Sequence, residues 1–224
     1  MEVLAPAGSK ETFKAALAGG ADAIYLGGKL FGARRFAHNF SDDELKAAVD
    51  TAHGRGVKVY VTVNTLIKER ELSLANSYLD LLDHIGADAV IVQDRGLVKL
   101  IKERYGLDVH ASTQMGIHSP EDALWAQRQG ISRAILSREL TLSEIARIAT
   151  STTIGLEVFV HGALCYAFSG QCLFSSILGG RSGNRGMCAQ PCRKRYTLGP
   201  TSGYLLSTAD LFSIEALPRL MEIG

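Results

Sequence analysis

The sequence predicts an α/β protein of the TIM-like (β/α)8 barrel class that lacks its last strand. Short apolar, β-branched runs alternate with longer amphipathic stretches at a period of about 20 to 35 residues, as in repeated strand–helix units. Gly20, Gly86 and Gly130 each stand at an expected helix end, with an apolar run a few residues later. No Gly-x-Gly-x-x-Gly follows the first run, so an open dinucleotide-binding sheet fits the sequence less well.

Seven strands are expected from these runs, at residues 3–5, 23–26, 58–63, 89–92, 108–111, 133–136 and 157–160. The helices between them begin with recognisable caps: the capping boxes Ser41 to Glu44 and Thr141 to Glu144, and Ser119 before Pro120. A helical stretch at 209–223 ends the series, and no eighth strand follows it. Because such barrels typically need about 250 residues, we expect residues 1–224 to form one incomplete barrel domain. An oligomer or a partner chain could complete it.

The overall charge is nearly balanced, with 24 Lys and Arg against 23 Asp and Glu. This balance excludes a generally basic nucleic-acid binder but not a local basic patch. No apolar run approaches the roughly 18 residues of a membrane span, and no secretory signal is recognisable at the start. We therefore expect a cytoplasmic protein that does not enter the membrane and whose cysteines are not structural disulfides.

All four cysteines fall in an expected insertion at about 161–203, after the seventh strand, with the spacing Cys165-x6-Cys172-x15-Cys188-x3-Cys192. In a barrel this loop lies on the face where active sites are built. Thiolates suit zinc or iron–sulfur clusters. The last pair has a spacing typical of zinc sites, but the first pair does not, whereas a cubane cluster tolerates irregular spacing. An iron–sulfur cluster is therefore favoured, with zinc and unligated or redox-active cysteines as alternatives.

Several other side chains are candidates for substrate contacts. His161 follows the seventh strand beside Cys165 and is either a proton donor or substrate contact, or is hydrogen-bonded to the loop. The insertion carries arginines but no Asp or Glu, and its cations either clamp a carboxylate or phosphate or balance the charge of a cluster. The candidate clamp residues are Arg181, Arg185 and Arg193.

Polar residues at or near the strand ends are expected to face the barrel mouth. They are Gln93, Asp94, His110, Ser112, Gln114, Arg138 and Glu139. Gln93, Gln114 and Arg138 are the candidates for substrate binding among them. Asp94 could instead cap the next helix. Glu157 is expected to be a buried structural partner, for example of an arginine, more than a catalytic acid.

The chain resembles peptidase family U32, the collagenase-like protease family, along essentially its whole length. The motifs that carry the resemblance are Glu157-x-Phe159-x-x-Gly162-Ala163-Leu164-Cys165-x4-Gly170-x-Cys172, Gly179-Gly-Arg-Ser-Gly-Asn-Arg-Gly186, Cys188-Ala-Gln-Pro-Cys-Arg193, Leu4-Ala-Pro-Ala-Gly8, Ile91-Val-Gln-Asp94 and His110-Ala-Ser-Thr-Gln114. Phe174 stands where the signature usually has an aliphatic residue. The family usually continues with a strand close to Lys-Ile-Glu-Gly-Arg and a further domain, which this sequence does not contain.

The resemblance implies one of two activities. Some relatives in the family are hydroxylation proteins that act on tRNA, rRNA or a ubiquinone precursor, whereas the name of the family implies proteolysis. The resemblance further implies a four-iron four-sulfur cluster on Cys165, Cys172, Cys188 and Cys192, and an association of the RNA-acting members with prephenate. The sequence contains no His-Glu-x-x-His and no Gly-x-Ser-x-Gly. The leading hypothesis is therefore an iron–sulfur-dependent hydroxylation enzyme acting on RNA. The alternatives are a peptidase and a non-catalytic binding module whose metal stabilises the loop.

Overall fold

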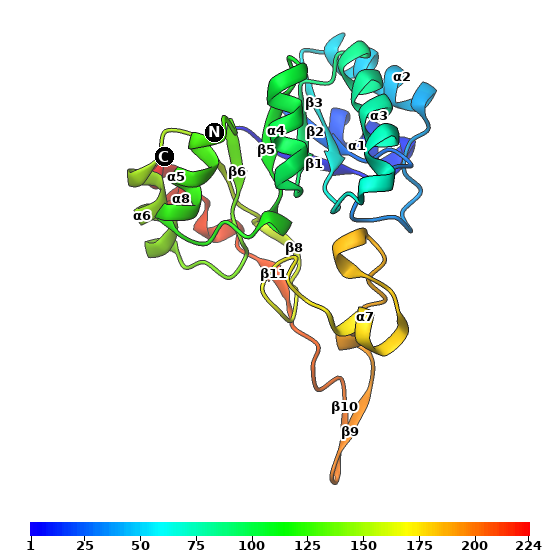
Figure 1. Cartoon of the computed structure of the whole chain (residues 1–224). Helices are drawn as coiled ribbons and strands as arrows, with labels where there is room; N and C mark the ends of the chain where they lie inside the picture. The colour runs from blue at the N-terminus through cyan, green and yellow to red at the C-terminus, as the bar shows by residue number, and fades with distance from the viewer.

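A curled sheet of seven parallel strands organises the computed structural model, which describes residues 1–224. The strands follow one another in chain order and β1 does not pair with β7, so the sheet is a TIM-like barrel open where the last strand would lie (Figure 1). The strands are β1 (Leu4–Ala7), β2 (Ala23–Leu26), β3 (Lys58–Val63), β4 (Ala89–Val92), β5 (Asp108–Ala111), β6 (Arg133–Ile135) and β7 (Gly155–Glu157).

Helices follow the strands and cover the outer side of the sheet. They are α1 (Lys10–Ala18), α2 (Asp42–His53), α3 (Leu72–His84), α4 (Arg95–Arg104), α5 (Pro120–Arg128) and α6 (Leu142–Ser151), with short 3-10 turns η1 (Glu69–Glu71) and η2 (Thr113–Met115). The capping boxes at Ser41 and Thr141 are confirmed, as is the Ser119 cap before Pro120. The main apolar core joins the helices to the sheet, and a smaller cluster that includes Tyr60 and Ile91 fills the barrel interior. None of the helices combines the length and the apolar composition that a membrane crossing requires.

The expected insertion at 161–203, hereafter the cysteine-rich segment, has more regular structure than an irregular loop. It contains β8 (His161–Ala163), α7 (Phe174–Gly179), η3 (Gly183–Arg185), η4 (Pro191–Arg193) and a hairpin of β9 (Tyr196–Leu198) and β10 (Thr201–Gly203). In Figure 1 this segment lies below the barrel, and the hairpin projects farthest from it.

Two of the expected elements, the seventh strand and the last helix, have wrong boundaries. The seventh strand is Gly155–Glu157 and not 157–160, because Glu157 is the last residue in register with β6, opposite Ile135. The expected helix at 209–223 begins only at α8 (Leu217–Ile223), after η5 (Ile214–Ala216). Its first part is β11 (Asp210–Phe212), which pairs antiparallel with β8. The first and sixth strands differ by one or two residues at their ends.

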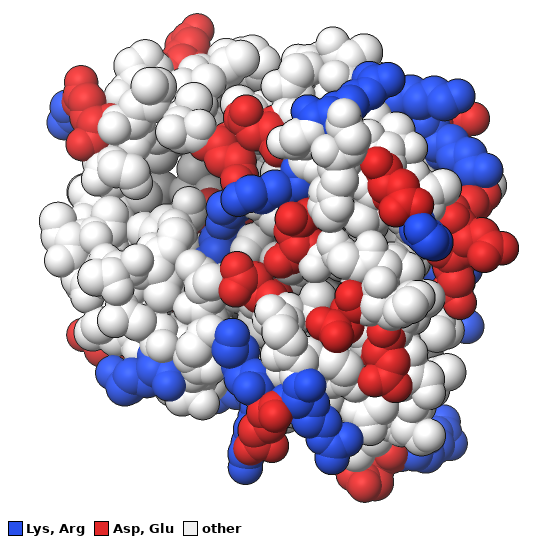
Figure 2. Space-filling model, turned by 90° about the horizontal axis from the view of Figure 1, so that it is seen from above, with Lys and Arg blue, Asp and Glu red and all other residues white.

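The barrel interior holds a polar network near the amino-terminal ends of the strands. Arg133 binds Glu2 (Nη1–Oε1 2.5 Å) and lies 3.7 Å from Glu157, and the Tyr60 hydroxyl donates to Glu2 at 3.0 Å. His110 packs edge-on against Tyr60 and lines a cavity of about 290 Å³ there, so the expectation that it faces the mouth is wrong. Figure 2 views the end opposite the cysteine-rich segment, where acidic and basic side chains are interspersed and neither charge dominates.

Glu157 makes the stability of this network depend on pH. Burial raises its pKa to about 7 although Arg133 lowers it, so the folded protein holds this proton more tightly than the unfolded chain. The contribution of Glu157 to the free energy of unfolding therefore falls as the pH rises from the ordinary carboxyl pKa toward 7. We expect Glu157→Gln to remove a decline of roughly 2–3 kcal/mol over that range. Urea unfolding of both proteins at several pH values measures the difference; parallel curves would contradict the prediction.

Candidate functional site

The cysteine-rich segment packs over the carboxyl-terminal ends of the strands, where the loops after β2, β3 and β6 hold it. The Arg35 amide donates to the Gly186 carbonyl and the Leu66 amide to the Asn184 carbonyl, each at 3.3 Å. The Ser169 amide donates to Glu139 Oε1 at 2.9 Å. These contacts place the segment on the face of the barrel that carries active sites in this class of fold.

Two glycines allow the backbone of the segment to approach the barrel closely. Gly170 has a φ of 76°, and a Cβ atom there would lie 2.7 Å from the Cα of Gln114 in η2. Gly186 has a φ of 73°, and a Cβ atom there would collide with the carbonyl of Gly32 after β2. The docking therefore depends on positions where only glycine avoids both strain and collision.

Two of the predicted substrate-binding arginines make ion pairs within the protein. Arg185 forms a bidentate pair with Glu71 in η1 (Nη2–Oε1 2.5 Å, Nη1–Oε2 2.8 Å), and this pair lowers the pKa of Glu71 to about 2. Arg193 donates to the carbonyls of Leu164 and Thr208 and lies 3.3 Å from Asp210 Oδ1. Both guanidinium groups thus hold segments of the chain together, and a direct role in substrate binding stays a prediction.

The four cysteines are free thiols; Cys172 and Cys192 are half-buried, and Cys165 and Cys188 are exposed. Burial raises the pKa of the Cys192 thiol, and the nearby thiols of Cys165 and Cys188 raise it further. No group of three or more His, Cys, Asp or Glu side chains is gathered closely enough to hold a single metal ion.

The surroundings of these sulfurs bear on whether an iron–sulfur cluster fits. The amides of Phe174 and Gln190 donate to Cys172 Sγ and Cys188 Sγ, each at 3.4 Å. Hydrogen bonds of this kind stabilise cluster thiolates. No Asp or Glu occurs between residues 158 and 209, so no carboxylate of the segment competes for a soft metal. Four thiol donors in a segment without carboxylates suit a soft metal or a cluster, and binding of a cluster by these residues stays a prediction.

Arg138 is the predicted substrate-binding residue with the most unusual environment. Its guanidinium lies 4.0 Å from the centroid of the Phe159 ring, and Nη1 donates to the Ala163 carbonyl at 2.6 Å. Nε is buried without a hydrogen-bond partner, and no carboxylate lies within ion-pair distance. Burial lowers the pKa of Arg138, and the charge of Arg34 lowers it further. Arg138 is therefore a partly desolvated cation that an anionic ligand would stabilise.

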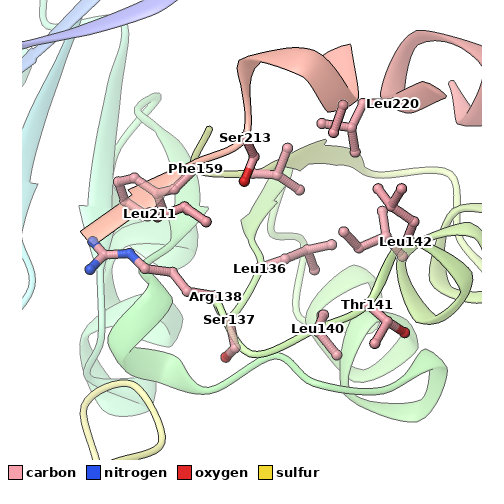
Figure 3. A pocket seen from close by; sticks show the side chains of 13 residues that line it. Leu136, Ser137, Arg138, Leu140, Thr141, Leu142, Phe159, Leu211, Ser213 and Leu220 are labelled. Atoms are coloured by element: carbon pink, nitrogen blue, oxygen red, sulfur yellow. The ribbon is translucent and has the colours of Figure 1, made fainter. Parts of the chain in front are cut away.

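Arg138 also borders an apolar cavity of about 270 Å³ between the β6–α6 connection and the last helix. Figure 3 shows Leu136 and Leu142 on one side facing Leu220 on the other, with Arg138 at one end beside Phe159 and Leu211. The cavity is smaller than most sites for drug-sized ligands and too apolar for a nucleotide.

The remaining candidates have different environments. His161 is exposed on β8, and its ring packs edge-on against Phe212 with centroids 5.9 Å apart. Gln93 is buried and Gln114 half-buried, and the side-chain carbonyl of each lacks a partner. Asp94 caps α4 by accepting a hydrogen bond from the Leu97 amide at 3.0 Å. Of its two expected roles, a residue at the barrel mouth or a helix cap, the structure thus shows the helix cap.

Three residues on the face of the barrel that carries the cysteine-rich segment were not among the candidates predicted from the sequence. Glu71 and Asn184 hold the cysteine-rich segment, and Phe36 is a large aromatic side chain that is 64% exposed. The signal for Phe36 is its position directly after Arg34 and Arg35.

Comparison with known proteins agrees with the motifs. The model of peptidase family U32 matches residues 8–224. The chain is 42% identical to the 23S rRNA 5-hydroxycytidine C2501 synthase of Escherichia coli, over all of this chain and 35% of that protein. It is 33% identical to tRNA hydroxylation protein P1 of Bacillus subtilis, over all of this chain and 56% of that protein. The chain thus spans about half or less of the length of these relatives. A solved U32 peptidase superposes with a TM-score of 0.63 at 20% identity, covering 72% of this chain and 69% of that one, which shows the fold.

Proposed function

We propose that this chain, which belongs to peptidase family U32, forms the catalytic barrel of an enzyme that hydroxylates a nucleoside in RNA. The observation that carries the proposal is the cysteine-rich segment over the barrel mouth, with four free thiols and no carboxylate. The relatives named as rRNA and tRNA hydroxylation proteins support the choice of RNA as substrate. The reaction class replaces a C–H bond of the nucleoside with C–OH, a two-electron oxidation for which an external oxygen donor supplies the oxygen atom and accepts the two electrons.

The residues proposed to hold a four-iron four-sulfur cluster are Cys165, Cys172, Cys188 and Cys192. When bound, such a cluster supplies electron transfer. The arginines and amides around the sulfurs are proposed to stabilise its negative charge. Zinc on the same residues is the alternative, and the metal content of the purified protein distinguishes the two.

Arg138 is proposed to bind an oxyanion of a ligand in the barrel mouth. It has no acidic partner, and its planar guanidinium is held against Phe159, which leaves it suited to bidentate recognition of a carboxylate or phosphate. Prephenate, the carboxylate that the family resemblance implies, is one ligand of this class. His161 is exposed and free to approach a substrate, and we retain it as the proposed proton donor.

Expression of the full-length protein in a bacterial strain without its own RNA hydroxylation proteins tests this function. Mass spectrometry of nucleosides from total tRNA and rRNA is expected to show one nucleoside that is one oxygen heavier than its parent. Cells that express Cys192→Ser serve as the control and are expected to lack it. If the wild-type protein adds no such nucleoside but cleaves gelatin or casein in a purified assay, the peptidase alternative replaces this proposal.

A further inference from the structure

An exposed aromatic side chain lies among arginines at the point where the loop after β2 meets the cysteine-rich segment. Phe36 is 64% exposed, and the guanidinium of Arg181 lies over its ring, 4.6 Å from the centroid. Arg34 and Arg35 precede Phe36 directly and are exposed. These four residues, Arg34, Arg35, Phe36 and Arg181, are called the Phe36 patch.

The patch is held in place from both sides. The Arg35 amide donates to the Gly186 carbonyl at 3.3 Å, and Arg35 Nη1 lies 3.8 Å from the sulfur of Met187. Arg181 Nε donates to the Met187 carbonyl at 3.2 Å, which fixes its side chain over Phe36. The loop after β2 and the cysteine-rich segment therefore form one surface, which is a preorganised arrangement.

The arginines of the patch are available for an external anion. None of the three has an acidic side chain within ion-pair distance, in contrast to Arg185 and Arg193. The charge of Arg34 lowers the pKa of Arg138, so Arg34 also adds to the positive potential at the barrel mouth.

We propose that the Phe36 patch binds an unpaired segment of the RNA substrate, with a base stacked on the Phe36–Arg181 pair and adjacent phosphates bound by Arg34 and Arg35. This inference rests on the proposed function, which it deepens by naming the strand state of the substrate. Aromatic rings and arginine planes bind any exposed base face, and phosphates supply the anions that the free arginines attract. In a duplex the base faces are covered by stacking, so a paired helix offers the patch only its phosphates.

The test uses the anaerobically purified full-length protein and a fluorescent single-stranded RNA of about 12 nucleotides, with a hairpin of the same composition as the paired probe. Fluorescence anisotropy is expected to show tighter binding of the single strand. Phe36→Ala and Phe36→Leu are expected to weaken that binding about tenfold, whereas Phe36→Tyr retains it, because stacking requires the ring. Phe36→Leu keeps an apolar side chain and so separates stacking from burial.

The salt dependence of binding reports on the arginines separately. Arg34→Ala and Arg35→Ala are each expected to lower the slope of log K against log salt by about 0.7, the value for one lost phosphate contact on a single strand. Arg147→Ala, an exposed arginine on α6, is the matched control and is expected to leave the slope unchanged. Thermal melting of every variant checks that the fold is intact.

The inference is overturned if the Phe36 variants bind the single strand as tightly as the wild type, or if the two arginine variants keep the wild-type slope. In that case a hydroxylated nucleoside in the expression assay would still support the proposed function. Failure of the proposed function itself would be seen differently, as no added oxygen in any nucleoside.

Discussion

Replacing Cys188 with Ser is expected to prevent binding of the proposed cluster and to abolish the proposed hydroxylation while the barrel stays folded. A serine hydroxyl is a poor ligand for iron, and Cys188 lies in a segment whose contacts with the barrel come from other residues, among them Arg185 and Ser169. Protein purified without oxygen is expected to contain about four irons and four sulfides per chain in the wild type and less than about one of each in the variant. Absorbance near roughly 400 nm and elemental analysis measure this loss.

Met187→Leu is the matched control for metal content, because it removes the neighbouring sulfur, which contacts Arg35, and keeps all four thiols. Far-ultraviolet circular dichroism of both variants is expected to match the wild type, since the core lies between the sheet and its helices. Full iron content in Cys188→Ser would mean that this residue is not a ligand. One zinc per chain in the wild type, with no iron, would support the zinc alternative.

The central strands could be predicted from the sequence because their burial leaves a clear signal. The strands at Lys58–Val63 and Ala89–Val92 are nearly continuous apolar runs, and both lie between two paired neighbours. A strand buried on both faces requires such a run, so its limits coincide with the limits of the pattern. The caps at Ser41 and Thr141 could also be predicted from the sequence, because each capping box joins two residues that are only three positions apart.

The last strand of the sheet could not be placed in this way. Residues 158–160 are more apolar than Gly155–Glu157, yet it is the earlier residues that pair with β6. Register with a neighbour decides where a strand ends, and the composition of one strand does not contain that information. The mistaken helix at 209–223 has the same origin, because β11 exists only through its pairing with β8, about 50 residues earlier.

The ion-pair partners of Arg185 and Arg193 also could not be predicted from the sequence. The insertion contains no acid, so Arg185 and Arg193 look unpaired in a reading of the segment alone. Glu71 lies 114 positions before Arg185, and only the folded barrel brings the loop after β3 under the cysteine-rich segment. In the same fold Arg138 and Arg181 form no ion pair and instead lie over aromatic rings. Arg185 and Arg193 therefore hold the cysteine-rich segment in place, whereas Arg138 and Arg181 remain free to bind an anionic ligand.

Gly170→Ala is expected to displace the cysteine-rich segment from the barrel mouth and lower the hydroxylation rate about 100-fold. A Cβ atom at this position would lie 2.7 Å from both the Cα and the carbonyl oxygen of Gln114. Because these are backbone atoms, a rotamer change cannot relieve the collision, and the segment or η2 must shift. Limited proteolysis is expected to cleave residues 161–203 faster in the variant, and single-turnover measurements give the loss of rate.

Gly180→Ala separates the effect of the collision from that of backbone strain. Gly180 lies in the same segment and also has a positive φ, of 64°, but nothing lies within 4 Å of the Cβ atom that alanine would add. The strain alone is expected to cost about 1 kcal/mol and to leave the segment docked and the enzyme active. If both variants lose activity equally, backbone strain in the segment is sufficient to explain the loss. If only Gly170→Ala loses it, close contact between the cysteine-rich segment and Gln114 is what aligns the thiols with the barrel mouth.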